Sequence, residues 1–216
     1  MAVRTLVHRP LDPQCRAIRL MMAEKRLEFA LREPQGQDQG QEVLPTLIEE
    51  NGFSIPGAAL CLEFVNEAYP DAQLLGDEPY ARVEARRLAH YFLFDISKWV
   101  TQPLLDEKLY KPLSRIGPAN SQVVADAQTL KQDFLEFLTQ LYAANNWLAG
   151  PSYSVADIAA AAQVSTLDFM NEIAWDNFRD LKRWYARVKS RRAMASVLAD
   201  KVDGVVTPSH YANPDF

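Results

Sequence analysis

The sequence predicts a small α/β domain followed by an all-helical domain. Residues 3–32 show a strand–helix–strand pattern, and residues 44–69 show a strand–strand–helix pattern. Beyond residue 80, apolar residues recur only at the three- and four-residue spacing of amphipathic helices. The predicted boundaries are residues 1–76 for the α/β domain, 77–202 for the helical domain and 203–216 for a C-terminal tail.

The first part of the α/β domain is predicted to form a parallel unit. Residues 3–8 alternate weakly between apolar and polar side chains, as a half-buried strand does. After Pro13, a helical pattern places Cys15 and Ile18 on one face, and a second alternating stretch follows at residues 27–32. A strand–helix–strand connection within one sheet favours a right-handed parallel pair.

The second part is predicted to be an antiparallel hairpin and a helix. Asn51 and Gly52 separate the strand at residues 44–48 from the next one, and this pair tolerates the positive φ angles of a two-residue hairpin turn. A helix at residues 58–69 completes a βαβ–ββα order with a mixed four-stranded sheet, which is the thioredoxin-like arrangement. Pro45 stands where that fold places a cis-proline.

Residues 154–157 carry the clearest local signal in the helical domain. Ser154 can accept a hydrogen bond from a backbone N–H of the first helical turn, and the Asp157 carboxylate can accept one from the Ser154 N–H in return. We therefore expect a buried helix to begin here. Further helices are expected around residues 88–99, 123–141, 178–188 and 191–199.

Composition and charge exclude several classes of protein. The hydrophobic share of 48% and the charged share of 24% are ordinary for a soluble protein, and a net charge of −5 gives no case for nucleic acid. Cys15 and Cys61 are too few for a disulfide framework, and the three histidines have no metal-binding spacing. The start lacks a signal-peptide core and no apolar run is long enough to span a bilayer, so we expect a cytoplasmic protein without membrane insertion.

Four segments, in this order, resemble those of the glutathione transferase superfamily. They are DPQCRAIRL at residues 12–20, LPTLIEENGFSIPGAALCLEF at 44–64, WLAGPSYSVADIAAAAQ at 147–163 and NFRDLKRWYARVKSRRAMASVL at 177–198. The resemblance covers nearly the whole chain. It implies a thioredoxin-like first domain, a helical second domain and a homodimer.

The residue that would activate glutathione departs from the family pattern. The family uses Ser, Cys or Tyr to hydrogen-bond the glutathione sulfur, and Asp12 stands at the matching position. An ionised aspartate only accepts hydrogen bonds and repels a thiolate. Cys15 is a weaker catalytic candidate, because the helix N-terminus with Arg16 and Arg19 would lower the pKa of its thiol. Its alternative interpretation is a small buried hydrophobe, and we assign no catalytic residue.

The rest of the expected glutathione site is also degenerate. Pro56 and Gly57 replace the carboxylate and serine that hold the γ-glutamyl end, although the Gly57 backbone N–H could still contribute to a weak anion site. No Lys or Arg occurs between Glu33 and Ala81, a stretch with ten acids that would repel glutathione. We therefore expect no cofactor. The degenerate site comprises Asp12, Leu44, Pro45, Pro56 and Gly57.

Two features point to protein binding. Seven basic residues and one acid, Asp180, lie in residues 179–192, which fits either a solvated helix face or a docking surface for an acidic partner. Trp184 and Tyr185 would anchor such a partner if either is exposed. The tail is rich in Pro, Tyr and Phe, which fits either a frayed terminus or a docking segment. The residues expected to contact a partner are Arg179, Arg183, Arg187, Arg191, His210, Tyr211, Asp215 and Phe216.

The tail, with the degenerate glutathione site, resembles a non-catalytic branch of the superfamily, the FzlA-like proteins. These bind the bacterial tubulin homologue FtsZ in cell division. The resemblance implies a homodimeric regulator that binds FtsZ, or another acidic filament, at the division site. The alternative is a divergent glutathione transferase or thiol-dependent reductase that acts on a small electrophile through Cys15. A stress-response or chaperone-like partner protein with the same fold is a third hypothesis.

Overall fold

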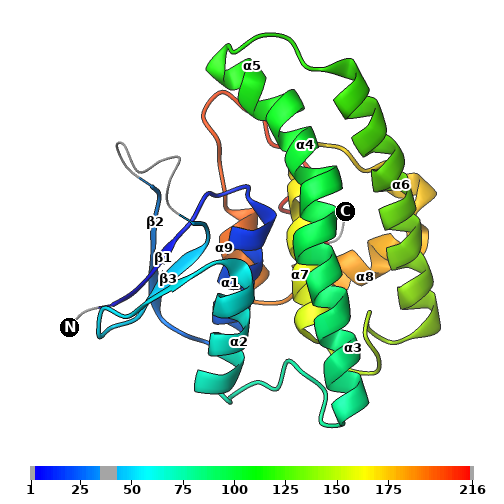
Figure 1. Cartoon of the computed structure of the whole chain (residues 1–216). Helices are drawn as coiled ribbons and strands as arrows, with labels where there is room; N and C mark the ends of the chain where they lie inside the picture. The colour runs from blue at the N-terminus through cyan, green and yellow to red at the C-terminus, as the bar shows by residue number, and fades with distance from the viewer. Residues whose placement is uncertain (1–2, 35–42, 215–216) are drawn as a thin grey trace.

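A mixed four-stranded sheet and two helices form the N-terminal part of the computed structural model, which describes residues 3–34 and 43–214 (Figure 1). The sheet order is β2-β1-β3-β4, with β1 parallel to β2 and the other pairs antiparallel. This topology confirms the predicted α/β arrangement. The elements are β1 (Arg4–Val7), α1 (Pro13–Glu24), β2 (Phe29–Arg32), β3 (Thr46–Ile48), β4 (Ser54–Pro56) and α2 (Ala58–Ala68).

The prediction for the connection before β3 is confirmed, and the prediction for the connection after it is wrong. The Leu44–Pro45 peptide bond is cis, as predicted. The predicted two-residue hairpin turn is wrong, because the Glu49 N–H donates to the Phe53 carbonyl (2.9 Å) across a three-residue loop. Within that loop only Gly52 has a positive φ, of 84°, which suits a three-residue connection closed by a left-handed glycine.

The helical part begins with one long helical stretch. The α-helices α3 (Pro79–His90), α4 (Gln102–Leu105) and α5 (Lys111–Ser114) are joined by the π-helical segments η2 (Tyr91–Thr101) and η3 (Asp106–Tyr110). Each widened segment ends shortly before a proline, Pro103 or Pro112, which lacks the N–H of a regular helix. The predicted helix around residues 88–99 is therefore part of a longer one.

The remaining helices follow the predicted order. They are α6 (Ser121–Ala144), α7 (Val155–Phe169), the 3₁₀ turn η4 (Trp175–Asn177), α8 (Arg179–Lys189) and α9 (Met194–Leu198). The last is shorter than predicted. None of the helices in the described part of the chain has the length and apolar character needed to cross a membrane.

Helix α7 is buried along its whole length, as predicted from residues 154–157. Ser154 Oγ accepts from the Ala156 N–H (3.3 Å), and Asp157 Oδ2 accepts from the Ser154 N–H (3.0 Å). The other carboxylate oxygen of Asp157 accepts from the Leu148 N–H (3.1 Å) and from Trp184 Nε1 (3.0 Å). Asp157 therefore completes the capping box and also connects α7 to the preceding loop and to α8.

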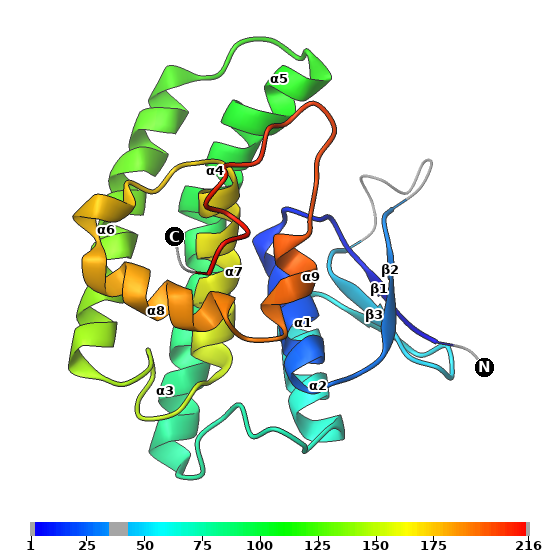
Figure 2. The same ribbon diagram turned by 180° about the vertical axis from the view of Figure 1, so that it is seen from behind.

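Helix α1 lies between the sheet and the helical part (Figures 1 and 2). Its side chains Arg16 and Arg19 are 0% and 1% exposed, and both guanidiniums reach Asp200, at 3.0 and 2.9 Å. Arg16 also donates to Ser165 Oγ (3.0 Å) on α7. Since buried charges are stable only when they are paired, this cluster fixes α1 against the segment that follows α9.

The buried imidazole of His8 makes stability depend on pH. Its exposure is 4%, and its pKa is lowered from 6.5 to about 4, first by burial and then by the charge of Arg19; Arg16 also lowers it, and Asp200 partly opposes this. Between these two pKa values His8 is protonated in the unfolded chain and neutral in the folded chain. The contribution of the neutral His8 to the free energy of unfolding is therefore fully present above pH 6.5 and is lost as the pH falls towards about 4. The total loss is up to about 3 kcal/mol.

We expect His8→Leu to remove much of this pH dependence. Urea unfolding at pH 7.5 and pH 5 measures it for both proteins. The loss of unfolding free energy on acidification should be about 2 kcal/mol larger in the parent protein than in the variant. Equal losses in both proteins would contradict the assignment.

Candidate functional site

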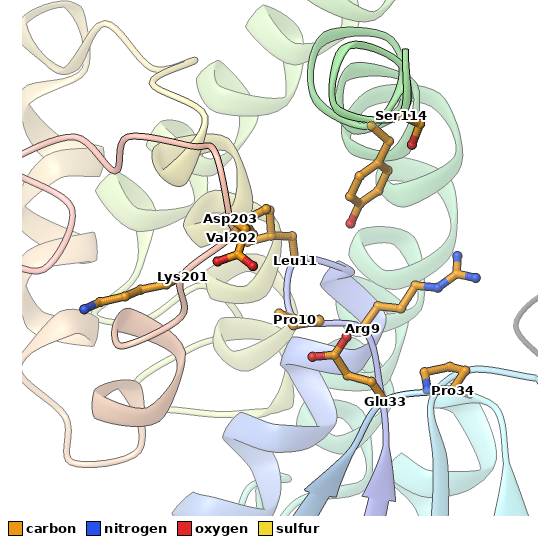
Figure 3. Close-up of a pocket in the computed structure, with 10 residues that line it drawn as sticks. Arg9, Pro10, Leu11, Glu33, Pro34, Ser114, Lys201, Val202 and Asp203 are labelled. Atoms are coloured by element: carbon orange, nitrogen blue, oxygen red, sulfur yellow. The ribbon is translucent and has the colours of Figure 1, made fainter. Parts of the chain in front are cut away.

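A cavity of about 590 Å³ opens between the two parts of the chain. Its walls come from four segments that are distant in sequence (Figure 3). One follows β1, one follows β2, one is the end of the long helical stretch and one follows α9. The lining residues are Arg9, Pro10, Leu11, Glu33, Pro34, Tyr110, Ser114, Lys201, Val202 and Asp203.

The cavity is mixed in character. Leu11 belongs to a buried apolar cluster behind it, while its charged residues comprise two cations and two carboxylates. The pKa of Tyr110 is raised to about 12, mainly by burial and next by the nearby charge of Asp12, so its phenol stays protonated at neutral pH. Within the described residues, no three His, Cys, Asp or Glu side chains could hold a metal ion together. The cavity therefore combines charges of both signs with a protonated phenol and an apolar floor.

Asp12 serves as the N-cap of α1. Its Oδ1 accepts from the Cys15 N–H (2.8 Å). Burial raises the pKa of this carboxyl, while hydrogen bonds from the backbone of Cys15 and Gln14 lower it. Oδ1 is thus occupied in helix capping, and this hydrogen bond uses the carboxyl as an acceptor.

The Gly57 backbone N–H is also already used. It donates to the carbonyl of Pro45 (2.7 Å), so the weak anion site expected from this N–H is wrong. Pro56 ends β4 beside it. The structure therefore brings Pro45 and Gly57 together, but Asp12, Leu44, Pro45, Pro56 and Gly57 are all absent from the described lining of the cavity.

Cys15 is a packed hydrophobe. It is 0% exposed, and its pKa is raised well above the ordinary value, first by burial and then by Asp12. The expected lowering by Arg16 and Arg19 is wrong, because both guanidiniums are directed to Asp200. A thiol with a raised pKa and no solvent access is a poor nucleophile.

The arginines of residues 179–192 have different environments. Arg179 and Arg183 are exposed, and Arg183 pairs with Asp180 (2.9 Å). Arg187 is exposed but lies over the Trp147 ring, 4.0 Å from its centroid. Arg191 pairs with Glu24 (2.6 Å).

The aromatic anchors predicted in this run are wrong. Trp184 and Tyr185 are both 0% exposed, since they form the buried face of α8. The exposed surface of α8 is therefore cationic without an aromatic anchor from these two positions.

The described part of the tail packs against the helical domain. His210 Nε2 lies 2.9 Å from Asp168 Oδ1, and Lys189 lies 3.0 Å from the other oxygen of the same carboxylate. Tyr211 is 0% exposed, stacks edge-to-face on Phe169 at 5.3 Å and donates its hydroxyl to the Val197 carbonyl (3.1 Å). The prediction that Tyr211 contacts a partner is wrong in this conformation. Asp215 and Phe216 lie outside the described residues.

Sequence reasoning missed the cavity residues Arg9, Tyr110 and Lys201. They come from separate segments, and no motif or spacing marks them. The family resemblance pointed only to the β1–α1 connection, because it placed Asp12 there, and Arg9 lies in the same connection.

We expect Tyr211→Ala to destabilise the protein by about 3–5 kcal/mol, because it removes a large, fully buried ring. Tyr211→Phe keeps the buried ring and loses the hydroxyl, which bonds to Val197, and should cost about 1 kcal/mol. Chemical unfolding of both variants measures the two losses. A Tyr211→Ala loss no larger than that of Tyr211→Phe would mean that the tail is frayed in solution.

Comparisons with known proteins agree with this fold. The sequence model for "Glutathione S-transferase, C-terminal domain" matches residues 88–192. FtsZ-localized protein A of Caulobacter vibrioides (strain NA1000 / CB15N) is 34% identical over 99% of this chain and 98% of its own length.

Solved structures are similar over the same length. FzlA from C. crescentus has a TM-score of 0.93 and 33% identity, and a glutathione S-transferase from Sinorhizobium meliloti 1021 has a TM-score of 0.92 and 32% identity. Each comparison covers 99% of this chain and 100% of the other. The chain therefore belongs to the glutathione S-transferase superfamily and, within it, to the branch of FtsZ-localized protein A.

Proposed function

We propose that this chain is a binding protein with a glutathione-transferase fold that associates with FtsZ filaments in the cytoplasm, at the division site, and regulates cell division. The observation that carries the proposal is the full-length similarity to FtsZ-localized protein A, at 34% identity. The regulator needs no glutathione under this proposal.

The residues at the expected glutathione site favour this function over thiol chemistry. A glutathione S-transferase and FzlA are almost equally similar in sequence and structure, so overall likeness does not separate the two functions. The contacts of three site residues support the binding function. Asp12 accepts instead of donating, the Gly57 N–H is occupied, and Cys15 is buried with a raised pKa.

The exposed cations of α8 are the surface that we assign to the acidic filament. Arg179 and Arg183 suit this role better than Arg187 and Arg191, because the ion pair of Arg183 with Asp180 is itself exposed, whereas the other two guanidiniums pack against Trp147 and Glu24. Contacts between exposed charges weaken as salt rises, because the Debye length shortens.

We expect the double variant Arg179→Glu, Arg183→Glu to pellet less with FtsZ polymers than the parent protein does. Co-sedimentation in the presence of GTP measures this, and the difference should shrink from 50 mM to 300 mM salt. The charge-matched control is Lys98→Glu, Arg115→Glu, because both side chains are exposed, that of Lys98 in η2 and that of Arg115 directly after α5. A parent protein that stays in the supernatant with FtsZ polymers at both salt concentrations would refute the proposed function.

The protein also forms a homodimer under this proposal. Helices α2 and α3 border an apolar groove of about 400 Å³ that includes Leu62, Val83 and Phe94, and Val83 is 64% exposed. A two-fold axis would bring this face against its own copy. We expect sedimentation velocity to give a dimer for the parent protein and a monomer for Val83→Glu. A monomeric parent protein at micromolar concentration would contradict the dimer.

A further inference from the structure

A second cavity, of about 830 Å³, lies at the opposite end of α1 from the first one. It is bordered by the C-terminal end of α1, by residues 71 and 72, and by the connection from α8 to α9, which passes the end of α1 in Figure 2. Its charged lining residues are Glu24, Lys25, Arg26, Asp71, Arg191 and Arg192.

This cavity is cationic in a chain whose net charge is −5. Four of its charged residues are basic and two are acidic. Arg191 neutralises Glu24 through two contacts, Nε to Oε1 at 2.6 Å and an Nη nitrogen to Oε2 at 2.8 Å. The same guanidinium stacks over Tyr153, with 3.7 Å to the ring centroid, so it forms a fixed wall. Among the charged lining residues, Asp71 is then the one carboxylate that remains to balance Lys25, Arg26 and Arg192.

Lys25 is also held in place. Its side chain is almost buried, and Nζ donates to the Tyr69 carbonyl (2.6 Å). The ammonium therefore adds positive charge to the lining of the cavity at a fixed position.

Arg26 and Arg192 are different, because their guanidiniums are exposed and make no hydrogen bond or ion pair with another residue in the described ranges 3–34 and 43–214. Arg26 has a positive φ of 57° in the turn after α1, where its N–H donates to the Ala23 carbonyl (3.0 Å). Two unpaired guanidiniums therefore border one cavity. Each can bind a carboxylate through two parallel hydrogen bonds, which lysine cannot do.

We propose that this cavity binds an acidic peptide segment, with Arg26 and Arg192 each receiving an Asp or Glu carboxylate. The volume and the separate cations suit several carboxylates along a chain better than one small anion, and Ala23, Leu27 and Ala193 give the segment apolar walls. The identity of the partner rests on the proposed function, since the FtsZ filament supplies the segment. The peptide chemistry of the site does not depend on that partner.

The direct test uses fluorescein-labelled hexaglutamate and fluorescence anisotropy at 50 mM salt with the full chain. We expect saturable binding that weakens about tenfold in Arg26→Ser, Arg192→Ser and is partly restored in Arg26→Lys, Arg192→Lys. The control Lys98→Ser, Arg115→Ser removes the same charge elsewhere and should keep the parent affinity. Absence of binding to the parent protein would overturn the inference. So would an equal loss in the control, which would indicate a general charge effect.

Co-sedimentation of the same variants with FtsZ polymers then separates the two proposals. Loss of both peptide and filament binding in Arg26→Ser, Arg192→Ser supports the cavity as a filament contact in addition to the exposed cations of α8. Loss of peptide binding with unchanged filament binding overturns that assignment. If the parent protein binds the peptide but ignores the filaments, the proposed function fails and the acidic-peptide site stands. Since both side chains are exposed, unchanged thermal unfolding is expected and shows that the variants fold.

Discussion

The pairing of Arg16 and Arg19 with Asp200 is the interaction on which the rest of the structure depends. Both guanidiniums are buried on α1, and the carboxylate that neutralises them lies beyond α9. Breaking such a cluster leaves an uncompensated buried charge, so α1, α7 and the C-terminal segment keep one arrangement. The two cavities lie at opposite ends of α1. The same constraint therefore positions the interdomain cavity and the cationic one.

The features that could be predicted from the sequence are local ones. The capping box of Ser154 and Asp157 and the cis bond before Pro45 each depend on a few neighbouring residues, and the structure contains both. The interactions that escaped prediction join distant segments. Asp157 also accepts from Trp184, and Arg16 pairs with Asp200, 184 residues away. No periodicity or spacing encodes such partners, because they are set by tertiary packing.

The same distinction applies to the site residues. The sequence predicts from the chemistry of aspartate alone that Asp12 is a poor thiol activator, and the structure shows that Asp12 caps α1. The sequence predicts a free N–H at Gly57, although the donor is bonded to Pro45. It also predicts that Tyr211 contacts a partner, whereas the ring is buried beside Phe169. Gly57 and Tyr211 both have the hydrogen-bonding or aromatic group that the prediction needed, but that group is already used in contacts with residues distant in sequence. Arg26 escaped notice because it lies far in sequence from the basic residues of α8.

The central claim is that this glutathione-transferase fold has lost the site that binds and activates glutathione. Calorimetric titration of the purified protein with reduced glutathione, up to millimolar concentration, tests it most directly. The account predicts no saturable heat, because Asp12 Oδ1 accepts from the backbone in capping α1 and the Gly57 N–H is already bonded. Saturable binding in the micromolar to millimolar range would contradict the account and would return the chain to the catalytic members of the superfamily.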